Sequence, residues 1–164
     1  MKTIAVVLTR YRDPLSRLVY FLNGGGFTHV SLSLDPDMKR MYSFNFKGFA
    51  EENAAKFKRH GVRIAKSYQL FVSDGAYERL AEQIGQFEDQ REKYSYSLLG
   101  VFCCYFHIPY KVQGRYFCSQ FVAEMLTAAR AVYLQRKPTL YLPNQLMWEL
   151  GRSLQLQRVQ YNVL

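Results

Sequence analysis

The sequence predicts a single domain that combines β-strands with α-helices. Its length of 164 residues suits one domain with a substantial core and leaves little room for a second. Residues 27–34 and 41–46 alternate apolar and polar side chains, which is typical of half-buried strands. Residues 118–126 instead repeat apolar side chains at helical spacing. No repeat, low-complexity tract or linker interrupts the chain, so we expect residues 1–164 to pack as one unit.

The first third of the chain has the clearest pattern. Residues 3–9 form an apolar run that predicts a buried strand. Asp13-Pro14 then supplies a helix cap and a first-turn proline, and the helix should end at Gly24-Gly25-Gly26. The strand over 27–34 has Val30 and Leu32 on an apolar face and His29, Ser31 and Ser33 on a small polar face. A turn at 35–37 leads into the strand over 41–46, so a hairpin is expected.

The rest of the chain is predicted less evenly. Residues 47–60 are polar without clear periodicity and suggest a loop or short helix, and the apolar run 98–106 leaves its type open. The other expected elements are a strand over 62–72, an amphipathic helix from about 73 to 93, a helix beginning at Cys118, a short helix through Leu150 and a final strand at 154–161.

The composition is globular and basic. Apolar residues make up 49% and charged residues 21%, a composition typical of a folded chain and not of a disordered one. The net charge of +9 permits an anionic partner, but no run of four basic residues and no nucleic-acid module appears. We therefore do not expect specific nucleic-acid binding, and a solvated basic surface is the simpler interpretation.

The sequence suggests a cytoplasmic location. The apolar run near the N-terminus is followed at once by Arg10 and Arg12 and lacks a small-residue cleavage site, which favours a strand over a signal peptide. No stretch approaches the roughly 20 apolar residues of a membrane-spanning helix. Three cysteines, two of them adjacent at Cys103 and Cys104, do not make a disulfide framework, so reduced thiols are expected.

Cys118 is the candidate nucleophile. It begins a predicted helix, where unpaired N–H groups favour the thiolate form of a cysteine. His29 is the candidate base, because a predicted strand holds it, whereas His60 lies in a charged loop and His107 precedes Ile108-Pro109. The small side chains beside His29 would let a helix approach closely. We therefore expect the thiol and the imidazole to face each other.

Simpler interpretations apply to the same residues. A cysteine on the apolar side of a helix is usually a small core residue, and a histidine on a strand is usually a hydrogen-bonded or surface residue. Cys103 and Cys104 are interpreted as core. A zinc site built from Cys103, Cys104, His107 and Cys118 is disfavoured, because adjacent cysteines lack the usual spacing of zinc ligands. No metal or other cofactor is expected.

Three segments resemble a known family. They are Phe27–Asp35, Met41–Phe44 and Tyr116–Glu124, with sequences FTHVSLSLD, MYSF and YFCSQFVAE. They are similar to the permuted NlpC/P60 group of papain-like proteins, which includes the YiiX-like proteins and, more distantly, lecithin:retinol acyltransferase. In this group the histidine strand precedes the cysteine helix, the reverse of the order in papain, and His29 precedes Cys118 here.

The resemblance carries expectations about fold and activity. It implies an α+β fold in which a small antiparallel sheet or half-barrel packs against helices, as a circularly permuted papain-like domain. It also implies a cysteine hydrolase or acyltransferase that acts on an amide or ester bond of a small molecule, peptide or lipid. The family places a third polar residue on the strand after the histidine strand, which here is Ser43, with Asn45 as the alternative.

A second class of function stays open at the level of sequence. The chain could be a catalytically idle binding module that uses the same cleft, or its basic surface, to hold a ligand or an anionic partner. A thiol-reactive probe separates the two classes, since it should label Cys118 faster than Cys103 or Cys104 if Cys118 is an activated nucleophile.

Overall fold

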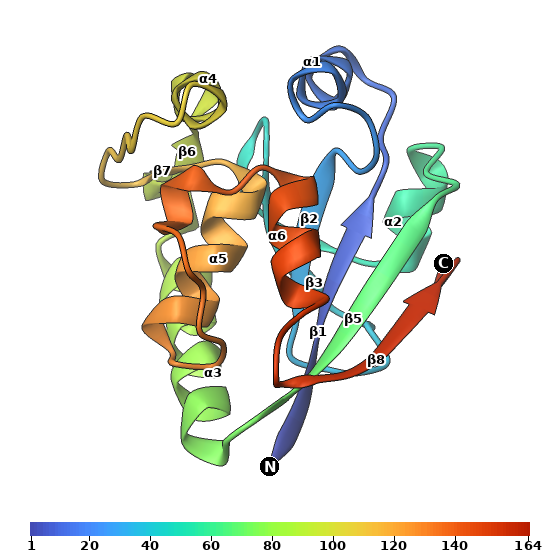
Figure 1. The fold of residues 1–164 in the computed structure, drawn as a ribbon, viewed down its shortest axis with the longest axis vertical. Helices are drawn as coiled ribbons and strands as arrows, with labels where there is room; N and C mark the ends of the chain where they lie inside the picture. Colours follow the sequence, from blue (N-terminus) through green and yellow to red (C-terminus); the bar gives the residue numbers. More distant parts are fainter.

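The computed structural model describes residues 1–164, and its centre is one antiparallel sheet of six strands (Figure 1). The strand order is β4-β3-β2-β1-β5-β8. These strands are β1 (Lys2–Thr9), β2 (His29–Ser33), β3 (Met41–Asn45), β4 (Gly48–Glu52), β5 (Ala65–Val72) and β8 (Leu156–Tyr161). A separate parallel pair joins the short strands β6 (Ser95–Tyr96) and β7 (Arg115–Tyr116).

Helices surround this sheet. The α-helices are α1 (Pro14–Leu22), α2 (Ala54–Arg59), α3 (Asp74–Asp89), α4 (Leu98–Tyr105), α5 (Cys118–Ala128) and α6 (Pro143–Leu150). Two 3₁₀ turns are η1 (Arg91–Lys93) and η2 (Pro138–Leu140). The expected α+β class, with an antiparallel sheet packed against helices, is confirmed.

The two faces of the sheet are covered differently. Helices α3, α5 and α6 lie against one face, where Val30 and Leu32 of β2 join Phe121 and Val122 of α5 in the main core (Figure 1). The opposite face carries a smaller cluster, into which α2 inserts Phe57. Strand β2 is buried along its whole length because both of its faces are covered.

Helix α1 begins and ends as its sequence predicts. The carboxylate of Asp13 accepts a hydrogen bond from the backbone N–H of Ser16 at 3.0 Å and so caps the first turn. The helix ends before three glycines that all have positive φ, and at Gly26 an added Cβ would lie 2.6 Å from Asn144 Oδ1. Glycine is therefore required where this turn approaches α6.

Two segments that the pattern left open adopt regular structure. Residues 47–60 contain the strand β4 and the short helix α2, and the apolar run from 98 forms helix α4. Strand β4 pairs with β3 across a tight turn, with Phe44 opposite Phe49 and Met41 opposite Glu52. The prediction of a loop or short helix over 47–60 holds for α2 but was wrong for residues 48–52, because cross-strand packing by Phe49 makes this part a strand.

No helix of the structure has both the length and the apolar character that crossing a bilayer requires.

Candidate active site

The N-terminus of α5 holds Cys118. Cys118 is the first helical residue and is buried, and its amide belongs to the first turn, where N–H groups have no partner within the helix. Gln120 Oε1 accepts a hydrogen bond from the N–H of Phe117, and Ser119 Oγ donates one to the carbonyl of Tyr141. These contacts fix the first turn of α5 against the rest of the domain.

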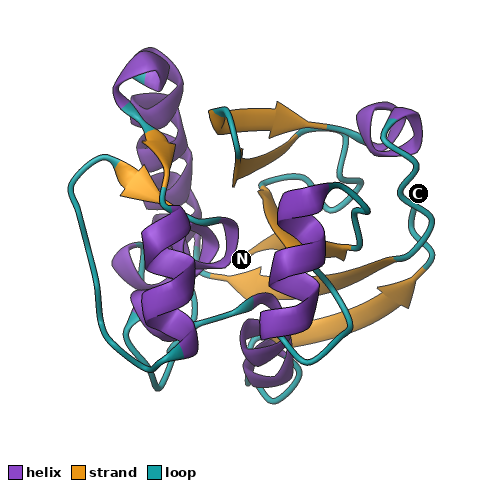
Figure 2. Ribbon diagram, turned by 90° about the horizontal axis from the view of Figure 1, so that it is seen from above, coloured by secondary structure: helices purple, strands orange, loops and turns teal.

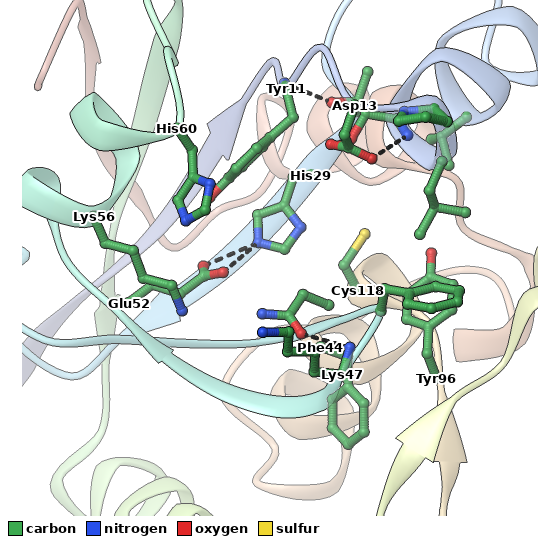
Figure 3. A pocket seen from close by; sticks show the side chains of 17 residues that line it. Tyr11, Asp13, His29, Phe44, Lys47, Glu52, Lys56, His60, Tyr96 and Cys118 are labelled. Atoms are coloured by element: carbon green, nitrogen blue, oxygen red, sulfur yellow. Dashed lines mark hydrogen bonds and ion pairs between the residues drawn. The ribbon is translucent and has the colours of Figure 1, made fainter.

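His29 lies between two partners. Its Nε2 is 3.0 Å and 2.9 Å from the two carboxylate oxygens of Glu52 (Figure 3). A carboxylate only accepts, so Nε2 carries a hydrogen, and Nδ1 remains free to exchange a proton. The thiol of Cys118 points toward the other side of the ring (Figure 3).

Glu52 is the residue that the sequence did not reveal. It is 1% exposed and ends β4, and its carboxylate also accepts a hydrogen bond of 2.6 Å from Ser31 Oγ. Burying a carboxylate without a countercharge costs free energy. Here the contacts with His29 and Ser31 compensate the charge of Glu52. The signal in the sequence was a two-residue connection, Phe46-Lys47, between aromatic segments, which would have predicted a second hairpin.

The two ionisable groups shift each other's pKa. Burial disfavours the imidazolium, but the carboxylate of Glu52 and hydrogen bonding to Cys118 and Glu52 outweigh burial and raise the pKa of His29 to about 10. Burial also opposes ionisation of Glu52, yet the charge of His29 and the hydrogen bonds from His29 and Ser31 hold the pKa of Glu52 below its usual value. The pair is therefore an imidazolium and a carboxylate at neutral pH.

The expectation that Ser43 or Asn45 orients the imidazole needs correction. Ser43 Oγ donates to the backbone carbonyl of Val30, and Asn45 Oδ1 accepts from the N–H of Lys47 at 2.9 Å. Strands β2 and β3 have a single residue pair in register, Leu32 with Tyr42, and the Ser43 hydroxyl supplies a bond to β2 where the ladder stops. The position beside the ring belongs to Glu52 of the next strand.

The approach of α5 to His29 also differs from the expectation. The helix packs against the apolar face of β2, the face of Val30 and Leu32, whereas Ser31 on the other face binds Glu52. His29 is the first residue of β2 and Cys118 is the first residue of α5, and both side chains line the same cleft. The small serines thus make room for a carboxylate and not for the helix.

A cleft of about 580 Å³ opens onto this group. Aromatic rings flank it: Tyr11 meets the ring of His29 edge-on with centroids 5.2 Å apart, and Tyr96 lies beside Cys118 (Figure 3). Burial, together with the charge on Cys118 and Asp13, raises the pKa of Tyr96, so this phenol stays protonated. The lining consists of Tyr11, Asp13, Pro14, Leu15, Ser16, Val19, Thr28, His29, Phe44, Asn45, Phe46, Lys47, Glu52, Lys56, His60, Tyr96 and Cys118.

The other cysteines lie away from the cleft in α4. Cys104 packs in a small apolar cluster, and burial raises the pKa of its thiol to about 12. All three cysteines are free thiols. No group of three or more His, Cys, Asp and Glu side chains is arranged to hold a metal ion.

Comparison with known proteins adds no relative: no protein-family description and no curated protein matches this sequence.

Proposed function

We propose that this protein is a cysteine hydrolase or acyltransferase that acts on an amide or ester bond, with Cys118 as nucleophile and His29 as base. Its relation to the permuted NlpC/P60 group is part of the same proposal and rests on the three motifs around His29, Tyr42 and Cys118. Glu52 takes the third position, as a residue that positions the imidazole and stabilises its charge.

The first step is attack on the carbonyl. With its Nε2–H directed at Glu52, His29 already holds the proton of the Cys118 thiol on Nδ1 before attack, so the two groups form a thiolate and an imidazolium. The thiolate sulfur then forms a bond to the carbonyl carbon. The carbonyl π-electrons move to the oxygen. Because the raised pKa of His29 favours the imidazolium, the ring retains this proton until the leaving group departs.

The next steps release the leaving group and then the acyl group. The N–H of Cys118, which has no partner within α5, then donates to the oxyanion. When the carbonyl re-forms, the C–N or C–O bond breaks and His29 protonates the departing amine or alcohol. Water or another acceptor then attacks the thioester, gives its proton to His29, and releases Cys118. The choice of acceptor distinguishes hydrolysis from acyl transfer.

The single observation that carries this proposal is the buried carboxylate of Glu52. Both of its oxygens lie within hydrogen-bond distance of Nε2 of the imidazole beside Cys118. A core cysteine and a surface histidine would need no such partner. The cleft supports the proposal because a binding-sized space of about 580 Å³ opens onto the same three side chains.

The test combines labelling with turnover. Iodoacetamide at neutral pH should modify Cys118 at least about tenfold faster than Cys103 or Cys104, read by peptide mass spectrometry. A panel of chromogenic amides, esters and thioesters should then identify a substrate that wild type and Cys103→Ser turn over and Cys118→Ala does not. Equal labelling of all three thiols, or turnover that survives Cys118→Ala, would reject the mechanism and favour an idle binding module.

A further inference from the structure

Helix α4 has a composition that a solvated helix does not have. Its eight residues, LLGVFCCY, include no charged side chain. A helix that is apolar on all sides is expected to be buried completely. Here only Gly100, Val101 and Cys104 are buried, while Leu99 is 57% exposed and Phe106, which follows the helix, is 66% exposed.

Helix α1 presents a similar outer face. Val19 is buried in an apolar cluster together with Val101 and Cys104 of α4, so the inner faces of the two helices pack into the same cluster. Phe21, on the outer side of α1, is 80% exposed, and Tyr20 beside it is also exposed. Figures 1 and 2 show α1 and α4 at the same end of the molecule, side by side and beyond the sheet.

The two segments that contain these helices have no acidic residue of their own, although Asp13 caps α1 and Glu124 pairs with Lys111 at 2.7 Å. From residue 14 to 34 and from residue 94 to 123 the chain contains no Asp or Glu. The same two segments contain the exposed Arg17 and Arg115, in addition to the paired Lys111. Arg17 lies three and four residues before Tyr20 and Phe21, so it shares their face of α1. The net charge of the chain, +9, has the same sign.

We infer that the outer faces of α1 and α4 dock on the surface of an anionic lipid bilayer. Exposed aromatic and aliphatic side chains flanked by Lys and Arg are what interfacial helices use, because the apolar groups enter the acyl boundary while the cations meet lipid headgroups. The complementary charge favours this occupant over a second copy of the chain, whose equivalent face would carry the same positive charge.

The docking surface lies next to the cleft. Leu15 and Val19 of α1 line the cleft, and Tyr96, which also lines it, stands two residues before α4. Docking therefore brings the lipid boundary to the helices that border the site. This inference does not depend on catalysis by Cys118, and vesicle binding tests it without any turnover measurement.

The test uses vesicles of phosphatidylcholine alone and vesicles with roughly a third phosphatidylserine, at about 0.1 M salt. Wild type should float with the anionic vesicles and bind neutral vesicles at least about fivefold less. The double variant Phe21→Ser/Phe106→Ser should lose about tenfold or more in affinity for the anionic vesicles. Circular dichroism checks that it folds, as exposed positions should allow.

A matched control replaces equally exposed apolar residues elsewhere. Trp148 is 60% exposed and Leu154 is 99% exposed, and neither belongs to α1 or α4. Trp148→Ser/Leu154→Ser should bind as wild type does. Arg17→Gln/Arg115→Gln should weaken binding to anionic vesicles about tenfold or more, whereas Arg152→Gln/Arg158→Gln, which removes the same charge elsewhere, should weaken it less.

Three results would overturn the inference. If wild type does not float with anionic vesicles, the outer faces of α1 and α4 are not a membrane-docking surface. Equal losses in the α1–α4 variants and in their controls would show only a diffuse attraction to a basic protein. A wild type that is dimeric by sedimentation, with the dimer lost in Phe21→Ser/Phe106→Ser, would show that a second copy covers these helices.

Discussion

At the scale of single residues, the site depends on which group stands behind His29. A serine hydroxyl can hold the ring in place but adds no charge to balance an imidazolium. Glu52 does both, since each of its oxygens lies about a hydrogen-bond length from Nε2. The difference is testable by removing the charge alone.

Glu52→Gln should lower the rate of Cys118 alkylation at neutral pH by about tenfold or more, because the imidazolium loses its buried counterion. The same change should lower the pKa of His29, which the midpoint of the pH–rate profile measures. Ser31→Ala, which removes one hydrogen bond from the same carboxylate, serves as the control and should have a smaller effect. An unchanged rate in Glu52→Gln would remove Glu52 from the site.

Ser43→Ala should separate stability from reactivity. The variant leaves the buried carbonyl of Val30 without its side-chain donor, so we expect a loss of about 1 to 3 kcal/mol in the free energy of unfolding by urea. The alkylation rate of Cys118 should stay within about twofold of wild type. A tenfold fall in that rate, in a protein of unchanged stability, would return Ser43 to the role first expected of it.

At the scale of elements, helix α6 holds the turn that delivers β2 to the site. Asn144 Oδ1 accepts from the N–H of Phe27 at 3.1 Å, and Nδ2 donates to the carbonyls of Asn23 and Gly25 at 3.3 and 2.8 Å. His29 follows this turn by two residues. A side chain 115 positions away in sequence thereby positions the strand that carries the candidate base.

Asn144→Ala should cost about 2 to 4 kcal/mol in the free energy of unfolding, since three hydrogen bonds are lost at a buried position. Amide hydrogen exchange over residues 23–28 should speed up in the same variant. Gln145→Ala, which removes a single bond to the N–H of Leu142, is the neighbouring control and should cost less. Equal costs and unchanged exchange would show that Asn144 does not hold the turn.

At the scale of the whole molecule, the His29–Glu52 pair links stability to pH. The pKa of His29 rises from about 6.5 in the unfolded chain to about 10 in the fold, so its contribution is complete below about 6.5 and disappears as the pH rises through about 10. The pKa of Glu52 is lowered, so its contribution is lost as the pH falls through the acidic range.

The difference in free energy of unfolding between wild type and His29→Gln should therefore be largest in mildly acidic solution and should shrink steadily toward pH of about 10. Urea titrations at a series of pH values measure it, and the comparison cancels the other groups that titrate in the alkaline range. A difference that grows with pH would contradict the assigned ion pair.

The sequence alone determined many of the local elements and two of the three groups at the candidate site. Capping at Asp13, the glycine turn, the alternation along β2 and the helical spacing after Cys118 are properties of neighbouring residues, and periodicity records them directly. The same patterns placed His29 on a strand and Cys118 at a helix start.

Only the tertiary structure decided how these elements meet. Pairing between β2 and β3 stops after one residue pair, and β4 forms because Phe49 packs across the sheet, so the partner of His29 comes from a strand that local periodicity does not mark. Glu52 in isolation looks like one more acidic surface residue. Its role depends on burial and on distances between residues far apart in the chain, and those quantities exist only once the sheet has assembled.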